Sequence, residues 1–451
     1  MRRTAPLAAL LLLVGTVACA PGSPAPASGP VQKAAAPPAA PPAATRPAAA
    51  VAATPIPWQD TALPSSAAPG ASTGDESAEH SEDNQKDSRR DPRIRLSVDP
   101  ATPRRLPSVP EIVLPDGVSQ EVFVSGLMLP VAFEFTPDGR QVFVNELYGK
   151  VRLVENGRLL PDPLVALPTT QGLEQGALGL ALDPAFARNR WFYVFYSQTR
   201  EGKNEPRRNR IVRFTEHDGR GTEETVILDN LPIGTPSPEN VNGDHNGGRI
   251  GFGPDGKLYV TIGDVAKRSE ARKAKSLYGK VLRINADGSI PDDNPDPDSR
   301  VFASGFRSPF GLDFQPRTGL PWVSDNGPRG HDEINRVVKG GNYGWPEEAG
   351  RVNGGLTTLT GPVWESTIDR YGPTGIAFYT GKAIPEWSND LFFCDWNTGS
   401  LWRLNLKPPA YDESERLDVV AQPCRLYVRT GLDGALYFSD HHAIYRLGPA
   451  R

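Results

Sequence analysis

Residues 243–264 place a histidine beside carboxylates and ahead of two expected strands. The segment begins with Asp244-His245, contains a Pro-Asp-Gly turn at 254–256 and ends at Asp264. A histidine side chain titrates near neutral pH, so His245 could take a proton from a hydroxyl group, and a neighbouring carboxylate would orient its ring. The competing interpretation is a turn histidine that only caps backbone. The position of His245 at the start of a strand favours the chemical role.

Two further charged side chains precede expected strands in the same way. Arg307 lies in the Gly-Phe-Arg-Ser-Pro-Phe-Gly-Leu segment 305–312, where its forked guanidinium could bind a carboxylate through two hydrogen bonds. Glu174 lies in the glycine-rich segment 172–179, directly before another strand. The ordinary alternatives are a salt bridge between neighbouring sheets for Arg307 and a solvated loop carboxylate for Glu174.

Residues 324–335 are rich in aspartate, asparagine, glutamate and glycine, and the Gly-Gly-Asn-Tyr-Gly-Trp-Pro segment 340–346 follows them. Calcium accepts several carboxylate and carbonyl oxygens, and glycine leaves carbonyl groups accessible, so this composition suits a Ca²⁺ site. The spacing of the acidic residues is not that of an EF-hand. On ligand types alone, an ordinary polar loop is an equally good interpretation.

Several common kinds of site are missing from the sequence. No Gly-x-Gly-x-x-Gly follows a strand and opens a helix, no Gly-x-Ser-x-Gly elbow stands between a strand and a helix, and neither a P-loop nor a Cys-x-x-Cys occurs. The sequence therefore contains none of the usual motifs for binding a nucleotide cofactor or for hydrolysis by a serine nucleophile. The formal net charge of −4 gives no basic field, so we expect no nucleic-acid partner.

Residues 1–18 are expected to form a signal peptide. A basic start precedes an apolar run at 7–17, which is shorter than the ~20 residues that span a bilayer. The sequence Thr-Val-Ala-Cys at 16–19 resembles a bacterial lipobox with Cys19 as the lipid-bearing residue, whereas 18–20 also fits ordinary signal cleavage. We prefer the lipoprotein. We therefore expect an exported protein of the periplasm or cell envelope, whose only membrane contact is a lipid anchor at Cys19.

Residues 19–105 are expected to be a disordered linker. Residues 21–71 are almost entirely Pro, Ala, Ser, Thr and Gly, and residues 75–95 are highly charged with mixed sign. Export also bears on the two later cysteines, because Cys394 and Cys424 could pair in an oxidising compartment. Two buried free thiols are an equally open alternative.

The folded part is expected over 106–451 and repeats one pattern. A short apolar strand meets a turn of Pro, Asp or Gly, and a second β-rich strand follows. Such strand pairs are expected at 133–144, 178–196, 250–262, 312–324, 376–393 and 430–438. Repeated antiparallel units without helices between them predict an all-β, six-bladed β-propeller. A β-sandwich explains the recurrence less well.

Long insertions between the repeats indicate the functional face of the expected propeller. They lie at 198–208, 231–242, 266–276 and 350–371. In a propeller such loops gather on one face, over the central channel. Glu174, His245 and Arg307 each stand before an inner strand of a different unit, so we expect them to surround the mouth of that channel.

A set of motifs, in this order along the chain, resembles a known family. The motifs are Glu-x-Gly-x-Leu-Gly-x-Ala-x-x-Pro-x-Phe at 174–186, Asp-His-x-Gly-Gly-Arg at 244–249, Gly-Pro-Asp-Gly-Lys-Leu-Tyr-Val-Thr-Ile-Gly-Asp at 253–264, Gly-x-Arg-x-Pro-x-Gly-Leu at 305–312, and Gly-Pro-x-x-x-Asp-Glu-Ile-Asn at 327–335 followed by 340–346. The set resembles the soluble glucose/sorbosone dehydrogenases, also called aldose sugar dehydrogenases, from about Ser108 to Leu447. Members of that family are six-bladed propellers that use pyrroloquinoline quinone (PQQ) and Ca²⁺.

The resemblance implies roles at the matching positions. His245 matches the catalytic base, which takes the proton from the anomeric hydroxyl as hydride leaves for the quinone, and Asp264 matches a carboxylate that orients this base. Glu174 matches a substrate-side residue, and Arg307 an arginine that contacts the quinone. The other matches are Asp244, Ser308, Thr374 and Arg425 for the cofactor, the carbonyl groups of Gly327 and Pro328 for the catalytic Ca²⁺, and Glu333 and Tyr343 for a structural Ca²⁺.

The sequence departs from the glucose enzyme of that family in three places. Ser308 replaces an asparagine, no lysine occurs near Asn397 to bind a PQQ carboxylate, and a pair of arginines is matched only loosely, by Arg425 and Arg429. PQQ carries several carboxylates, so fewer cations should weaken its binding. The aldose-type branch of the family has such losses, and PQQ and Ca²⁺ stay the expected cofactors.

The sequence therefore predicts a quinoprotein that oxidises a small-molecule sugar, an aldose, at its anomeric hydroxyl and passes electrons to an unknown acceptor. One alternative is a propeller that binds a sugar or a partner without redox chemistry, which would not need His245, Glu174 and Arg307 together. Another is a Ca²⁺-dependent propeller lactonase, which would require several side-chain oxygens converging on one ion.

Overall fold

The computed structural model describes residues 95–96, 105–112, 114–170, 172, 174–200, 203–237, 242–351, 358–411 and 413–450, all of them in the compact unit Ser72–Arg451. The expected signal peptide 1–18, the lipid-anchor residue Cys19 and nearly all of the expected linker 19–105 lie outside these residues. Within the linker stretch, β1 (Arg95–Leu96) pairs in parallel with β19 (Glu348–Ala349). No described helix is long and apolar enough to cross a membrane.

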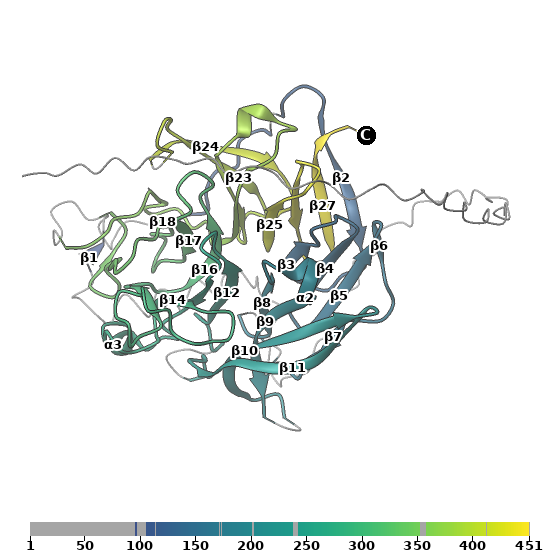
Figure 1. Ribbon diagram of the computed structural model, residues 1–451. Coiled ribbons are helices and arrows are strands. Elements are labelled where there is room, and N and C mark those ends of the chain that lie inside the picture. The colour runs from purple at the N-terminus through teal and green to yellow at the C-terminus, as the bar shows by residue number, and fades with distance from the viewer. Residues whose placement is uncertain are drawn as a thin grey trace, which may run out of the picture. The chain divides into compact units, whose positions relative to one another are not determined.

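Six antiparallel sheets form the described part of the chain (Figure 1). Each has four strands in its main path, and in five sheets these strands follow one another along the chain. From the inner to the outer strand, the sheets are β3 (Pro130–Phe135), β4 (Gln141–Glu146), β5 (Lys150–Glu155) and β6 (Arg158–Leu159), with β7 (Val165–Ala166) also on β5; β8 (Ala177–Leu182), β9 (Trp191–Thr199), β10 (Pro206–His217) and β11 (Arg220–Leu231); β12 (Gly247–Phe252), β13 (Leu258–Ile262), β14 (Lys280–Ile284) and β15 (Val301–Ser304); β16 (Pro309–Phe314), β17 (Pro321–Asp325), β18 (Glu333–Arg336) and β20 (Trp364–Glu365); β21 (Pro373–Phe378), β22 (Leu391–Asp395), β23 (Leu401–Leu406) and β24 (Ser414–Ala421); and β25 (Tyr427–Thr430), β26 (Leu436–Ser439), β27 (Ala443–Pro449) and β2 (Val118–Ser125).

The sheets are arranged as the blades of a closed ring. Each inner strand contacts the inner strand of the next blade, in the order β3, β8, β12, β16, β21, β25 and back to β3 (Figure 1). The ring is also closed by β2, which comes first in the described blades but pairs with β27 as the outer strand of the last one. The structure thus confirms the predicted six-bladed β-propeller, and the expected strand pairs are all present. The described helices, α2 (Phe186–Asn189), α3 (Arg268–Ala271) and η1 (Pro385–Trp387), are each a single turn.

Glycines in the inner strands let neighbouring blades approach closely. A Cβ on Gly179 of β8 would lie 2.3 Å from the carbonyl oxygen of Gly248 in β12, and one on Gly311 of β16 would lie 2.4 Å from that of Thr374 in β21. No larger residue could occupy either position without moving backbone. Large apolar side chains then fill the space between the sheets, so the starts of the inner strands are held on a rigid frame.

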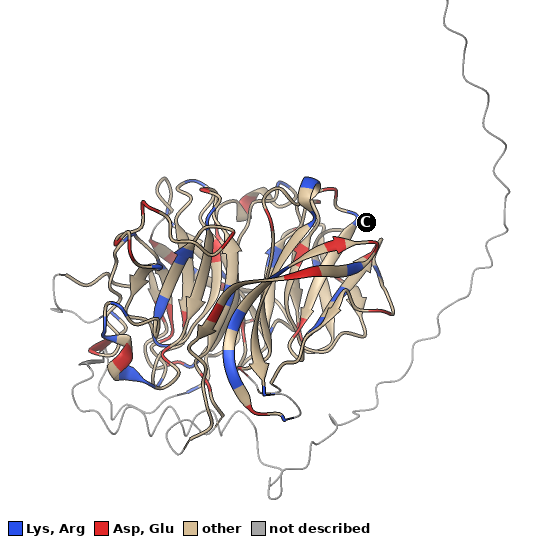
Figure 2. Cartoon of the chain, turned by 60° about the horizontal axis from the view of Figure 1, so that its bottom comes forward, with Lys and Arg blue, Asp and Glu red and all other residues tan. Residues whose placement is uncertain are grey.

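A disulfide between Cys394 and Cys424 links the last two blades in the ring. Cys394 lies on β22 and Cys424 stands shortly before β25, with 5.0 Å between their Cα atoms. Of the two alternatives left open by the sequence, the structure has the disulfide. Acidic and basic side chains are interspersed over the strands and loops of the propeller (Figure 2).

We expect removal of this disulfide to lower the stability of the propeller. The two cysteines are 30 residues apart, and closing a loop of that length raises the free energy of the unfolded chain by about 3–4 kcal/mol through lost conformational entropy. The double variant Cys394→Ala/Cys424→Ala should therefore unfold at lower denaturant concentration than the unreduced protein. The prediction is contradicted if wild type and double variant have equal denaturation midpoints. It is also contradicted if reducing the denatured wild-type protein releases no additional pair of titratable thiols.

Candidate active site

His245 is held by a buried carboxylate. Its Nδ1 lies 2.8 Å from Oδ1 of Asp264, and the indole Nε1–H of Trp345 donates to the other carboxylate oxygen at 2.8 Å. The Asp264 side chain has no exposed surface, whereas 14% of the His245 side chain is exposed. Because a carboxylate accepts hydrogen bonds, Nδ1 carries the hydrogen and Nε2 is the basic nitrogen. This is the arrangement that a general base requires.

The backbone of His245 is fixed in an uncommon conformation. Its φ is +61°, in the left-handed region, and its N–H donates to Oε2 of Glu174 at 2.6 Å. A Cβ on Gly263 would lie 1.9 Å from the carbonyl oxygen of His245, so only glycine fits there. A residue other than glycine keeps such a conformation only when its surroundings impose it. Glu174 and Gly263 therefore position the ring before any substrate binds.

Asp264 carries its negative charge inside the protein. Burial opposes ionisation, but His245, Arg307 and the N–H of Ala266 hold the pKa of the Asp264 carboxyl below its usual range. The hydrogen bond from Ala266 is 2.8 Å long. Asp244 is also buried, yet the histidine ring pairs with Asp264. Of the two carboxylates singled out in the sequence, Asp264 therefore orients the base.

Arg307 lies next to the same cluster. Its Nη1 donates to the carbonyl oxygen of Asn326 at 2.9 Å, and its Cζ lies 5.7 Å from the centre of a Trp345 ring. The carboxylate of Asp325 accepts the N–H groups of Arg307 and Ser308, at 2.9 and 2.6 Å. Asp325 thus fixes the start of β16. Ser308 Oγ is buried and has no hydrogen-bond partner among the described residues.

The expected cofactor contacts of the last two blades are joined to each other. The hydroxyl group of Thr374 lies 2.9 Å from the carbonyl oxygen of Arg425 and 3.2 Å from that of Cys394. The guanidinium of Arg425 donates to the carbonyl oxygen of Trp396 and is partly exposed. Asn397, where no lysine is available, donates its side-chain N–H to the carbonyl oxygen of Arg370 at 3.2 Å.

The loop that carries Gly327 and Pro328 is tightly folded. Residues 329, 330 and 331 all have positive φ, and the Asp332 carboxylate accepts the N–H of Gly327 at 3.2 Å. The same carboxylate accepts the N–H groups of residues 371 and 372. Within the described part of the chain, the carbonyl oxygens of Gly327 and Pro328 accept no hydrogen bond. Two buried carbonyl groups are therefore available to a hard cation.

Glu333 and Tyr343 are not joined by a hydrogen bond. The carboxylate of Glu333 accepts the N–H of Gly350 at 2.7 Å, and burial, reinforced by Asp325, raises its pKa to about 8. The hydroxyl group of Tyr343 donates to the carbonyl oxygen of Arg336 at 2.5 Å. The described residues include no group of three or more His, Cys, Asp and Glu side chains that could hold a metal ion.

The candidate residues lie at one end of the inner strands. Each precedes or begins a different one, namely Glu174 before β8, His245 before β12, Arg307 before β16, Thr374 in β21 and Arg425 before β25. The structure thus brings Glu174, His245 and Arg307 to the starts of three neighbouring inner strands. Sequence reasoning missed Trp345, Asp325 and Gln175. Trp345 and Gln175 lie inside quoted motifs, and Asp325 in the acidic run, but nothing marked their contacts across the fold.

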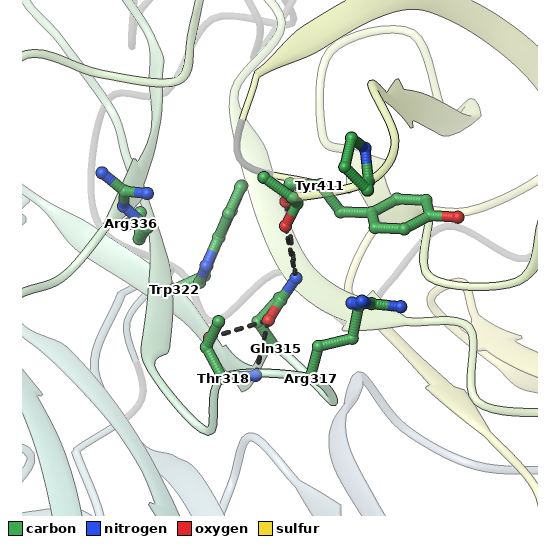
Figure 3. Close-up of a pocket in the computed structure, with 8 residues that line it drawn as sticks. Gln315, Arg317, Thr318, Trp322, Arg336 and Tyr411 are labelled. Carbon is green, nitrogen blue, oxygen red and sulfur yellow. Dashed lines mark hydrogen bonds between the residues drawn. The ribbon is translucent and has the colours of Figure 1, made fainter.

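A separate pocket of about 540 Å³ lies at the other end of blade four (Figure 3). The amide group of Gln315, just after β16, is hydrogen-bonded to Thr318 and to the carbonyl oxygens of residues 410 and 411. Since β16 begins beside Ser308 and ends at Phe314, this pocket and the His245 cluster lie at opposite ends of one strand. It is not part of the candidate active site.

Comparison with known proteins gives a consistent result. The profile of the family described as Glucose / Sorbosone dehydrogenase matches residues 127–446. An aldose sugar dehydrogenase of Escherichia coli is 28% identical over 339 residues, which cover 72% of this chain and 90% of the relative. The quinoprotein glucose dehydrogenase B of Acinetobacter calcoaceticus is 33% identical over 263 residues, covering 52% and 54%. The PQQ-bound structure of an aldose sugar dehydrogenase from Streptomyces coelicolor has a TM-score of 0.63 and 26% identity, and the match covers 74% of this chain and 99% of that one.

We expect Asp264→Asn to destabilise the protein in a pH-dependent way. The folded-state pKa of Asp264 lies below the unfolded value of about 3.9, so its ionised form favours the folded state. This contribution is complete above the unfolded pKa and is lost as pH falls through the folded-state pKa. The free energy of unfolding should therefore be lower for Asp264→Asn than for the wild type, by about 1–3 kcal/mol above pH ~5, with the gap narrowing towards pH ~3.

Denaturant titrations at several pH values test this expectation. Asp218→Asn is the matched control, because the Asp218 side chain is 90% exposed. A gap between wild type and Asp264→Asn that stays constant from neutral pH to pH ~3 would contradict the ionisation argument.

Proposed function

Because the chain belongs to the glucose/sorbosone dehydrogenase family, a family of sugar-oxidising oxidoreductases, we propose that it oxidises an aldose at the anomeric hydroxyl group with PQQ as the hydride acceptor. The observation that carries the proposal is His245, whose ring is oriented by the buried, ionised Asp264 at the start of an inner strand. A protein that only binds a sugar or a partner has no use for a base prepared in this way.

His245 acts as the general base in this proposal. Its Nε2 takes the proton of the anomeric hydroxyl while the C1–H bond breaks, so that the sugar leaves as a lactone. Asp264 stabilises the imidazolium that forms, and Trp345 holds Asp264 in place. Glu174 keeps the histidine backbone in its left-handed conformation. Each of these contacts exists in the protein itself, so little reorganisation is needed during the reaction.

The residues around the base fit a PQQ molecule. When bound, PQQ supplies a quinone that accepts two electrons with the hydride from the sugar. Arg307 and Arg425 would bind its carboxylates, and the buried hydroxyl of Ser308 has a hydrogen bond still to make. Thr374 fixes the backbone of Arg425, and Asp244 lies beside the base. The loss of a lysine near Asn397 leaves fewer cations for this purpose.

The proposal also includes a Ca²⁺ ion bound by the loop that carries Gly327 and Pro328. The carbonyl groups of Gly327 and Pro328 would be the protein ligands of a catalytic Ca²⁺, because they are buried and accept no hydrogen bond in the described part of the chain. Glu333 and Tyr343 would be ligands of a structural Ca²⁺. A lactonase-type site would require several side-chain carboxylates around one ion, and this loop offers carbonyl groups.

Export completes the proposal. The basic and apolar start of the chain and the cysteine at 19 support a signal peptide and a lipid anchor, which would place the enzyme in the periplasm or cell envelope. These residues lie outside the part that the structure describes.

Reconstitution tests the cofactor directly. Purified protein given PQQ and Ca²⁺ should reduce an artificial electron-accepting dye in the presence of one or more members of a panel of aldoses. PQQ at 100 times its Kd should also stabilise the folded protein by about 2.7 kcal/mol, seen as a higher melting temperature. The proposal is wrong if no aldose supports dye reduction and PQQ leaves the melting temperature unchanged.

Substitution of the base tests the mechanism. His245→Gln should lower kcat by at least about 100-fold, because general-base catalysis contributes that much or more. The PQQ-dependent rise in melting temperature should persist, since the substitution leaves Arg307 and Arg425 in place. His217→Gln is the matched control, because the His217 side chain is 77% exposed on blade two. Wild-type turnover by His245→Gln would remove this residue from the mechanism.

A further inference from the structure

A basic groove lies on the segments that follow blade two and the carboxylate Asp264 in the chain. It has a volume of about 650 Å³ and lies between the loop after β11 and the segment around α3. Its lining includes five lysines and arginines and a single glutamate, namely Arg207, Arg208, Lys267, Lys273, Lys275 and Glu270. The whole chain has a net charge of −4, so this excess of positive charge is local.

Both walls of the groove are attached to residues of the active site. On one side, the side-chain amide of Gln175 donates to the carbonyl oxygens of Gly234 and Gly243, at 2.8 and 3.0 Å. The neighbour of Gln175, Glu174, binds the backbone of His245. On the other side, the N–H of Lys267 donates to the carbonyl oxygen of Asp264 at 2.7 Å. The backbone on both sides of the groove is therefore fixed to the residues that hold the base and its carboxylate.

Three of the groove cations have no acidic partner among the described residues. Lys273 is paired with Glu270 at 2.5 Å, and Arg208 with Asp229 at 2.9 Å. Arg207, Lys267 and Lys275 are exposed and form no ion pair within the described ranges. Repulsion among these charges is reduced when an anion enters, so the groove favours negatively charged ligands.

The groove also has surfaces that suit a sugar ring. Tyr278 lines it with Leu277, Ile233 and Pro232, and the Nζ of Lys267 lies 5.4 Å from the Tyr278 ring centre. Aromatic and aliphatic side chains contact the C–H faces of sugars, while cations bind carboxylates. The volume lies within the range of small-ligand sites.

We propose that this groove is a subsite for acidic saccharides, and that the aldose oxidised beside it carries a carboxylate, as in a uronic acid or a short uronate oligosaccharide. The proposal rests on the sugar dehydrogenase function proposed above. The reducing end would lie at His245, and the carboxylates of the following sugar units would lie along Lys267, Lys275 and Arg207. A neutral aldose would gain nothing from these three charges.

Kinetics with matched sugars test the subsite. In the PQQ- and Ca²⁺-loaded protein, the ratio of kcat/KM for galacturonate oligosaccharides to that for neutral galactose oligosaccharides of equal length should exceed one and fall as salt is raised. The triple variant Arg207→Gln/Lys267→Gln/Lys275→Gln should lower this ratio about ten-fold, through the KM of the acidic sugar. The control variant Lys150→Gln/Arg158→Gln/Arg220→Gln removes three exposed charges elsewhere and should leave the ratio unchanged.

Binding without the cofactor separates this proposal from the function on which it rests. Calorimetry on the cofactor-free protein should show salt-sensitive binding of galacturonate oligosaccharides that the triple groove variant loses and the control variant keeps. Such binding without any dehydrogenase activity would sustain the subsite and overturn the function proposed above. Activity on neutral sugars with no binding of the acidic oligosaccharide would overturn the subsite, as expected if the groove instead receives an acidic protein.

Discussion

The ionised carboxylate of Asp264 is the interaction around which the site is organised. A charge with no exposed surface must be compensated by hydrogen bonds and opposite charge, or it would be protonated. Here the compensation comes from His245 beside blade three, Arg307 at the start of blade four, and Trp345 in the long segment after β18. The requirements of one buried charge therefore bring together two blades and a distant loop, and the orientation of the base follows from it.

The glycines near the base serve the same end. His245 keeps a left-handed backbone because Gly263 leaves room for its carbonyl group. Gly248 in blade three lies in close contact with Gly179 in blade two. A side chain at Gly263 would displace the backbone of His245, and one at Gly179 or Gly248 would separate blades two and three. The closeness of the inner strands and the geometry of the base are thus one constraint, which the closed ring of blades maintains.

The sequence predicts local features of this protein well because their causes are local. The Pro-Asp-Gly turn at 254–256 and the alternation around it depend on neighbouring residues, so the strands β12 and β13 could be recognised. The contact between Trp345 and Asp264 joins residues 81 apart, and no local pattern reports it. Nor does any local pattern show that β2 completes the last blade. Likewise, no local pattern shows that the Glu174 carboxylate binds the backbone of His245, 71 residues away.

Charge around Trp345 connects the site with the groove. The Cζ atoms of Arg268 and Arg307 lie 5.5 and 5.7 Å from Trp345 ring centres, so two guanidinium groups share one aromatic side chain. Burial lowers the pKa of Arg268 to about 10, and the positive charge of Arg307 nearby is a second, smaller cause. Arg268 follows the groove residue Lys267 directly in the chain, so one short segment carries a cation to Trp345 and another to the groove. An anion bound in this region would relieve the repulsion between the two arginines, whether it belonged to a cofactor or to the sugar.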